Sequence, residues 1–129
     1  MSSFEDTGGN FFLNVDGKIL DLISDDQALW LKTSKGLVVV LGCAYSGVVN
    51  TLNYISKLTG ACTFHAVIGG MHLGKVGLER WTATAETLTR YEVSLVVPMH
   101  CTGTQAATFL AKHLSGRVQP CGAGEKIVI

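Results

Sequence analysis

The chain has 129 residues, with ten basic and ten acidic side chains, and a mean hydropathy of +0.34. Because the charges cancel and form no basic stripe, the composition argues against nucleic acid as a partner. The longest unbroken apolar run, Leu37 to Leu41, is far shorter than the roughly 20 residues that cross a membrane, so no membrane association is expected.

Charged residues are scarce, at 16% of the chain, where an average soluble domain has about 25%. A monomer of this size would have few charges to cover its surface, so we expect apolar surface to be buried in a homo-oligomer, most simply a dimer. The length suits a single domain over 1–129, with a loop-rich N-terminal segment at 1–17. The cysteines form no CxxC pair and no signal peptide precedes them, which predicts a reduced, cytoplasmic protein.

The predicted elements are strands alternating with helices, and strands paired by crossover helices form a largely parallel sheet. Strands are expected over 18–23, 28–33, 37–42, 64–68 and 93–97, with short terminal strands at Val118 and 127–129. Helices are expected over 46–58, 79–91 and 104–114, the first capped by Ser46 and the last by Thr104. The fold class is therefore α/β.

The order of the elements also predicts an uncovered surface. Successive crossovers without a reversal of strand order place their helices on the same face of the sheet. Nothing else in the chain is long enough to cover the opposite face. This is an argument for a partner that is independent of composition.

Candidate functional residues follow the ends of the buried strands. The first such loop, Gly42 to Gly47, contains Tyr45 and Ser46 and can present free N–H groups to an anion, although an ordinary strand-to-helix connection has the same pattern. The second contains Gly70, which permits close backbone approach, and His72.

The third loop contains His100 and Thr102. Because the carboxyl ends of parallel strands meet at one edge, His72 and His100 are expected to lie at the same edge and are candidate metal ligands. Either one is alternatively a structural hydrogen-bonding group. We expect Cys43 and Cys101 to be small buried residues, and thiolate ligation is the alternative interpretation. The candidate ligand-binding residues are Tyr45, Ser46, Gly70 and Thr102.

Three segments in this order, over 25–60, 65–73 (HAVIGGMHL) and 96–114, resemble the C-terminal half of the metallo-β-lactamase superfamily. The most similar branch is that of the dihydropterin ribofuranosylaminobenzene 5′-phosphate synthase-like metal-dependent hydrolases. The resemblance implies half of a four-layer αββα sandwich, in which metal ions, usually zinc, lie at one edge between two sheets.

The chain departs from the family pattern at the metal ligands. It has no His-x-His-x-Asp-His loop, and Tyr45 stands where the family has a histidine ligand, while His72 and His100 match family ligands. A phenol that titrates near pH 10 is a poor zinc ligand, and catalytic zinc sites use about three protein ligands. We therefore assign no catalytic residue to this chain.

Three functions are compatible with the sequence. The first is a non-catalytic, self-associating half domain completed by a second copy. The second is a metal-dependent hydrolase of phosphate-ester-like substrates, using zinc or manganese, whose site is completed by a second copy or by a separate N-terminal-half polypeptide. The third is a module that binds a small anionic ligand without chemistry and without a metal.

Overall fold

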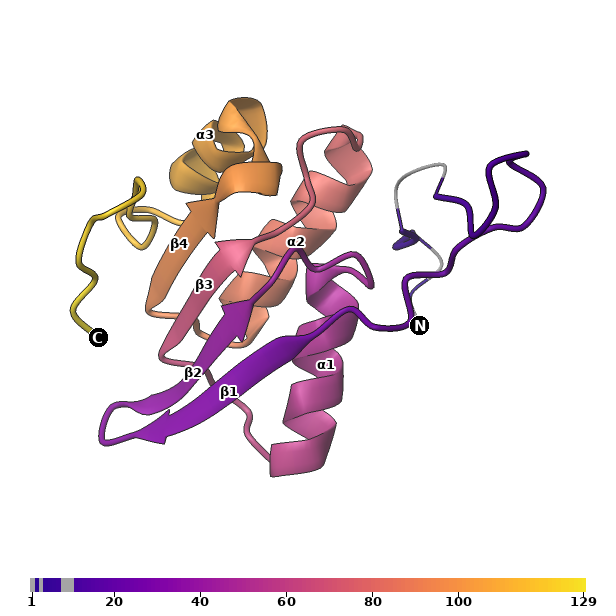
Figure 1. The fold of residues 1–129 in the computed structure, drawn as a ribbon. Coiled ribbons are helices and arrows are strands. Elements are labelled where there is room, and N and C mark those ends of the chain that lie inside the picture. Colours follow the sequence, from indigo (N-terminus) through magenta and orange to yellow (C-terminus); the bar gives the residue numbers. More distant parts are fainter. Residues whose placement is uncertain (1, 3, 8–10) are drawn as a thin grey trace.

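The computed structural model describes residues 2, 4–7 and 11–129 (Figure 1). Its elements follow one another in the predicted order of strands and helices. They are β1 (Ala28–Thr33), β2 (Gly36–Leu41), α1 (Val48–Thr59), β3 (Ala66–Gly70), α2 (Leu78–Arg90), β4 (Leu95–Met99), the 3-10 turn η1 (His100–Thr102) and α3 (Thr104–His113). Within the described residues no helix combines the length and apolar content that a membrane crossing needs.

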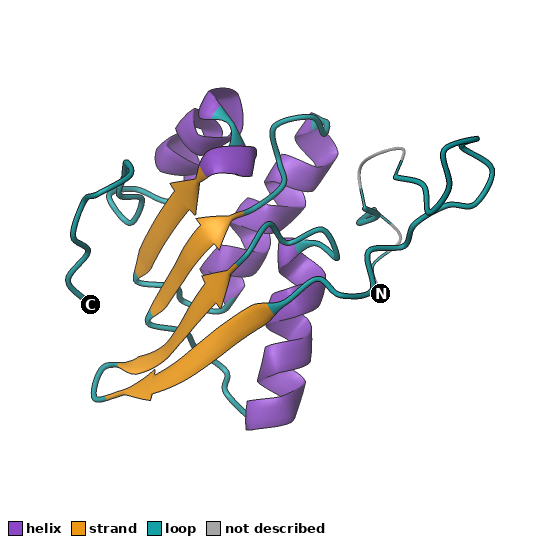
Figure 2. Cartoon of the chain, in the orientation of Figure 1, coloured by secondary structure: helices purple, strands orange, loops and turns teal. Residues whose placement is uncertain are grey.

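The strands form one mixed sheet whose spatial order, β1-β2-β3-β4, is the order of the chain. β1 and β2 pair as an antiparallel hairpin, and β2, β3 and β4 run parallel. Because the strand order never reverses, the crossovers carry α1, α2 and α3 to the same side of the sheet (Figure 2). The predicted α/β class, with a mixed sheet and helices on one face, is confirmed.

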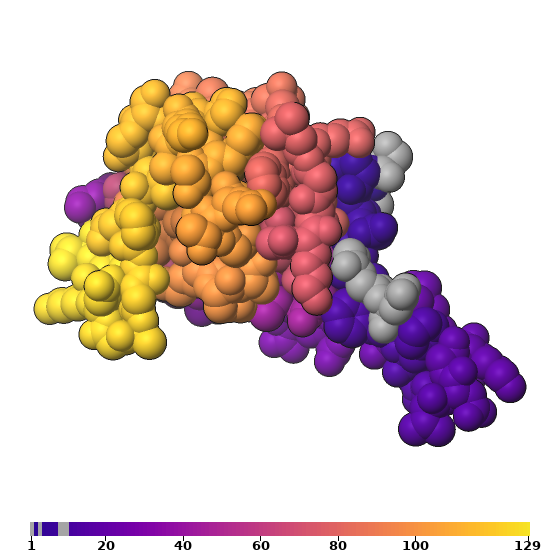
Figure 3. Space-filling model, turned by 90° about the horizontal axis from the view of Figure 1, so that it is seen from above, coloured from indigo at the N-terminus to yellow at the C-terminus, as the bar shows by residue number. Residues whose placement is uncertain are grey.

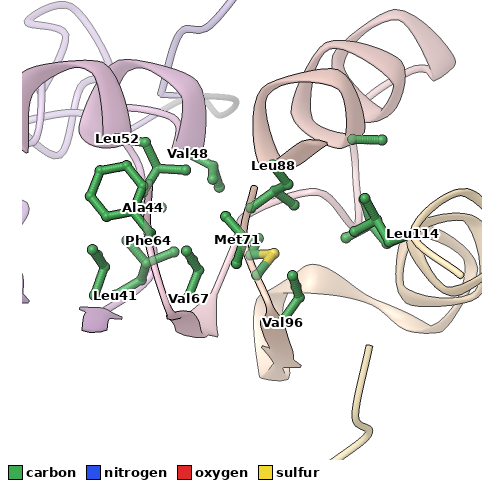
Figure 4. Packing of buried hydrophobic residues seen from close by; sticks show 14 of the residues in the cluster. Leu41, Ala44, Val48, Leu52, Phe64, Val67, Met71, Leu88, Val96 and Leu114 are labelled. Carbon is green, nitrogen blue, oxygen red and sulfur yellow. The ribbon is translucent and has the colours of Figure 1, made fainter. Parts of the chain in front are cut away.

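The face of the sheet beneath the helices holds the main core (Figure 4). We call it the helix face. Its strands contribute alternate residues such as Val39, Val67 and Val96, all fully buried, as the period of two along a strand requires. The amphipathic helices place Leu52, Leu88 and other buried side chains against them.

The opposite face, which we call the open face, consists of the residues that alternate with the helix face. The strand register places on it Leu29, Leu31, Val38, Val40, Ala66, Ile68, Leu95, Val97 and Met99. All of these side chains are apolar, and Thr33, Gly36 and Gly70 complete the face. At the β1 side, Leu29 and Leu31 are 58% and 46% exposed.

The chain covers more of the open face than the sequence predicts. After Val118, which makes one parallel bridge to Val96, the C-terminal segment turns so that Cys121 and Ile127 pack against the centre of this face. The pairing ends after Gln119, because the next β4 residue that faces this segment is Pro98, which has no N–H to donate. The expectation that nothing in the chain covers the open face is therefore wrong for its β4 side.

Two other predictions about secondary structure are wrong. The strand expected over 18–23 is reduced to a single bridge between Phe12 and Leu20, and 127–129 form no strand. Neither segment lies where a neighbouring strand can pair with it over several residues. Part of the loop-rich segment predicted over 1–17, namely residues 1, 3 and 8–10, lies outside the described residues.

Helix α1 begins differently from the sequence prediction, because its N-cap is Gly47 rather than Ser46. The buried carboxylate of Glu5 supplies the cap from a distance: its Oε1 accepts a hydrogen bond from the Val49 N–H at 2.9 Å and its Oε2 one from the Asn50 N–H at 2.7 Å. A carboxylate at the positive end of a helix dipole is favourable. Likewise, Gly103 rather than Thr104 is the N-cap of α3.

Candidate functional site

The loops that follow β2, β3 and β4 meet at the carboxyl edge of the sheet, which Figure 3 views from above. Hydrogen bonds join them directly. The Gly70 N–H donates to the Gly42 carbonyl at 3.1 Å, the Met71 N–H donates to Thr102 Oγ1 at 3.1 Å, and the Gly74 N–H donates to the Cys101 carbonyl at 3.1 Å. The edge is therefore a fixed platform built from segments far apart in sequence.

Three ligand-type side chains gather on this platform. The Sγ atoms of Cys43 and Cys101 and a ring nitrogen of His100 all lie within 4.8 Å of one another, and Cys43 Sγ is 4.0 Å from His100 Nδ1. The thiol of Cys101 donates to the Cys43 carbonyl at 3.5 Å and accepts a bond from the His72 N–H at 3.3 Å. Burial raises the pKa of the Cys101 thiol, so the sulfur is protonated when no cation is near.

The side chain of His72 lies beside this cluster but outside it. Its ring packs against Tyr45, with 4.5 Å between the ring centroids, and its Nδ1 is buried without a hydrogen-bond partner. Burial, helped by the Arg80 guanidinium, lowers the pKa of His72, so its imidazole is neutral at neutral pH. Among the described residues, the His/Cys/Asp/Glu group gathered around one point consists of Cys43, His100 and Cys101.

The backbone at this edge is strained. Ala44, His72 and His100, one residue in each of the three loops, have φ values of 51°, 48° and 20°. A left-handed backbone is uncommon for residues other than glycine, and it costs of order 1–3 kcal/mol where the surroundings enforce it. Such strain is concentrated at functional sites, and here it affects every loop of the platform.

Gly70 and Thr102, two of the four predicted ligand-binding residues, act as the floor of the platform. A Cβ at Gly70 would lie 2.5 Å from His100 Cε1 and 2.6 Å from Cys101 Sγ, so only glycine leaves room for the cluster. Thr102 is buried, and its hydroxyl holds the Met71 N–H.

Tyr45 and Ser46, the other two predicted ligand-binding residues, lie in the first loop. The Cys43 sulfur, and then burial, raise the pKa of the Tyr45 hydroxyl, so a phenolate ligand is disfavoured. Ser46 is exposed, and its N–H donates to Asp26 Oδ2 at 2.8 Å. Ser46 lines a groove of about 920 Å³ between β1 and α1, whereas Thr102 lines a separate groove of about 460 Å³ beside α3. The four residues do not line one common pocket.

Sequence reasoning gave ligation by the cysteines only as the alternative interpretation, and it missed Glu5. Cys43 and Cys101 each lie two residues beyond a strand end, the same signal that selected His72 and His100, but a free cysteine is more often a buried apolar residue. No local pattern connects Glu5 with a helix that begins more than forty residues later.

The gathered donor set does not match the histidine-based metal site that the family resemblance implies. His72 is not in the group around His100, and no carboxylate of the described residues joins it. Two thiols and one imidazole are instead the donors that borderline and soft cations select.

No family model matches the chain. It is 32% identical over 109 residues to the 7,8-dihydropterin-6-methyl-4-(β-D-ribofuranosyl)-aminobenzene-5′-phosphate synthase of Methanocaldococcus jannaschii, an alignment that covers 84% of this chain and 37% of the relative. It is 33% identical over 98 residues to the uncharacterized protein MJ0448 of the same organism, over 75% of this chain and 35% of the relative. The chain thus spans little more than a third of these curated relatives.

A solved structure shares the fold as well as the sequence. The chain is similar to Tm1679, described as a metal-dependent hydrolase of the β-lactamase superfamily, with a TM-score of 0.85 and 33% identity. The similarity covers 94% of this chain but 47% of Tm1679. In sequence and in fold, this chain is therefore related to one half of a metallo-β-lactamase superfamily protein.

Proposed function

We propose that this protein is a non-catalytic half domain that associates with a second copy of itself through the open face. The observation that carries the proposal is the composition of that face, where the residues contributed by β1–β4 carry no charge and are apolar apart from Thr33 at the end of β1. Leu29 and Leu31 stand exposed on its β1 side, beyond the reach of the C-terminal segment. Exposed apolar surface of this kind marks an interaction site.

A second copy is the occupant that the chemistry of the face favours. A two-fold interface brings the same patch together from both subunits, so the patch must be complementary to itself. A face without charged residues meets this condition, since no like charges are brought into contact. About half of Tm1679 has no counterpart in this chain, which is consistent with a partner that supplies another layer.

Light scattering coupled to size-exclusion chromatography tests the proposal. We expect the mass of a dimer at micromolar concentration and the mass of a monomer for Leu31→Lys, because the variant places a charge within the interface. Leu58→Lys is the matched control, since Leu58 on α1 is 53% exposed but lies on the other side of the sheet. A wild-type chain that stays monomeric at high micromolar concentration would contradict the proposal.

The strained histidines support a second candidate function. His72 and His100 both adopt a left-handed backbone at the carboxyl edge, and strain of this kind accompanies active sites. The candidate is a metal-dependent hydrolase of phosphate-ester-like substrates, completed in trans by a second copy or an N-terminal-half polypeptide. Hydrolysis of a nitrophenyl phosphodiester with added Zn²⁺ or Mn²⁺, abolished by His100→Ala, would support it. Hydrolysis no faster than in buffer alone would rule out the hydrolase function for the chain alone and for its dimer.

A further inference from the structure

We infer that Cys43, His100 and Cys101 form a thiolate-rich site for a single borderline or soft cation of the Zn²⁺ class. The site is different from a histidine site built on His72 and His100. It is assembled within one chain, so it does not depend on the self-association proposed above.

The separations between the donor atoms suit a shared ion. Around a tetrahedral zinc ion, with bonds of about 2.0–2.3 Å to nitrogen and sulfur, the ligand atoms lie roughly 3.3–3.8 Å apart. The three donor atoms here lie within 4.8 Å, and the Cys43 Sγ to His100 Nδ1 distance of 4.0 Å is already close to this range. Small side-chain rotations would bring all three onto one ion.

Neighbouring backbone groups position the donor atoms and leave them available to bind a cation. Cys101 is positioned by the His72 N–H and the Cys43 carbonyl, both backbone groups, while Gly70 keeps the space beneath His100 and Cys101 free of a side chain. Backbone contacts of this kind orient metal ligands and remain when neighbouring side chains change. His100 is exposed, so an ion can enter from solvent, and a fourth position remains for water or another ligand.

The donor chemistry selects the class of ion. Two thiolates and an imidazole favour Zn²⁺ over Mg²⁺, Ca²⁺ or Mn²⁺, which prefer carboxylate, carbonyl and water oxygens. A bound cation of this class also removes the thiol protons, so binding releases protons and turns the sulfurs into ligands.

Titration of the reduced, chelator-stripped chain with Co²⁺ under nitrogen tests the inference. We expect one Co²⁺ per chain with a thiolate-to-cobalt charge-transfer band in the near ultraviolet, which Zn²⁺ then bleaches. Cys43→Ser and Cys101→Ser should each reduce the band and weaken Co²⁺ binding. Loss of an outer-shell partner weakens metal binding roughly 10–100-fold, and loss of a direct ligand should weaken it at least as much. His100→Ala should weaken binding but keep a sulfur band.

Three variants serve as controls. Cys62→Ser and Cys121→Ser remove the thiols outside the cluster and should leave the band unchanged. His72→Ala keeps the backbone N–H that bonds to Cys101 and should also leave it unchanged. A full band in the Cys43→Ser, Cys101→Ser double variant would overturn the inference, and so would a band lost in His72→Ala.

A measurement on the unmodified chain keeps the test decisive if the serine variants do not fold. Cadmium NMR of the wild-type chain distinguishes a resonance in the range of sulfur ligation from one in the range of nitrogen and oxygen ligation. The latter, or no bound cadmium at all, would overturn the inference. Light scattering of the same sample measures its mass and so tests the dimer proposal independently of cation binding.

Discussion

The two faces of the sheet are made from the same mainly apolar strands but are covered in different ways. On the helix face, α1, α2 and α3 bury Val39, Val67 and their neighbours without help from outside the chain. On the open face, the C-terminal segment shields Ala66 and Val97, while Leu29 and Leu31 remain exposed. The helix face therefore holds the main core, although Trp30 at its β1 edge is 39% exposed, and the open face is covered on its β4 side only.

This difference teaches that β-strand composition alone does not say which face of a sheet is buried within the chain. Strands buried on both faces read as continuous apolar runs, as β2 does in LVVVL. Such a run predicts that both faces are covered, but it does not say whether the cover belongs to the same polypeptide.

The largest expected effect lies on the helix face. Leu52→Ala should lower the free energy of unfolding by roughly 2–5 kcal/mol, because Leu52 is fully buried and its removal leaves a cavity. Leu29→Ala on the open face should change the stability of the monomer by less than about 0.5 kcal/mol. Urea unfolding of both variants, at a concentration where the chain is monomeric, measures the contrast. Equal losses in the free energy of unfolding would show that the two faces contribute equally to the stability of the monomer.

The next effect lies at the carboxyl edge, where the two faces meet. Gly70→Ala should destabilise the chain by about 1–3 kcal/mol, the range for overpacking, since the new Cβ would press on His100, Cys101 and the Gly42 carbonyl. Gly77→Ala is the matched control, because nothing lies within 4 Å of a Cβ built there. Thermal unfolding monitored by circular dichroism compares them, and similar melting temperatures would show that the edge is not tightly packed.

A smaller effect is expected where the N-terminal segment supports the helix face. Glu5→Gln keeps the size of the side chain but weakens its bonds to the Val49 and Asn50 N–H groups. The loss should be about 1 kcal/mol, within the roughly 0.5–2 kcal/mol range of helix N-caps. Chemical denaturation against Glu92→Gln, an exposed glutamate outside this cap, measures it. An unchanged midpoint would mean that α1 does not need this carboxylate.

The smallest effect tests how much the C-terminal segment contributes to the open face. Ile127 is half-buried against the cluster that contains Val97. Ile127→Ala should therefore cost about 1 kcal/mol, less than a fully buried aliphatic side chain would. Val128→Ala, at a residue that is 78% exposed, is the control, and urea midpoints give the difference. A loss as large as that of Leu52→Ala would make the open face a second complete core.

Much of the fold follows from patterns that are local in the sequence. Helical spacing predicts α1, α2 and α3 to within two residues at each end, and the run at 28–33 matches β1. The side on which the helices lie follows from the order of the crossovers. What the sequence does not reveal is long-range: the capping of α1 by Glu5, and the packing of the C-terminal segment on the open face beyond Gln119.

The candidate site was predictable in position but not in composition. Strand-end placement correctly brings the loops of His72 and His100 to one edge, because parallel strands share their carboxyl edge. Which side chains point toward each other depends on φ values that only the folded backbone defines. With φ at 48°, His72 packs on Tyr45, while His100 turns toward the two sulfurs.

The sequential strand order has a consequence for how this chain folds. Each strand pairs with its nearest predecessor in the chain, but only the β1–β2 hairpin closes a short loop. The parallel pairings close longer loops that contain α1 and α2, so they lose more chain entropy. We therefore expect the hairpin to form before the parallel pairings, which are slower to form. The apolar open face is complete once β4 has paired with β3, before the chain meets another molecule. Assembly would then follow folding as a separate step, at a rate set by protein concentration.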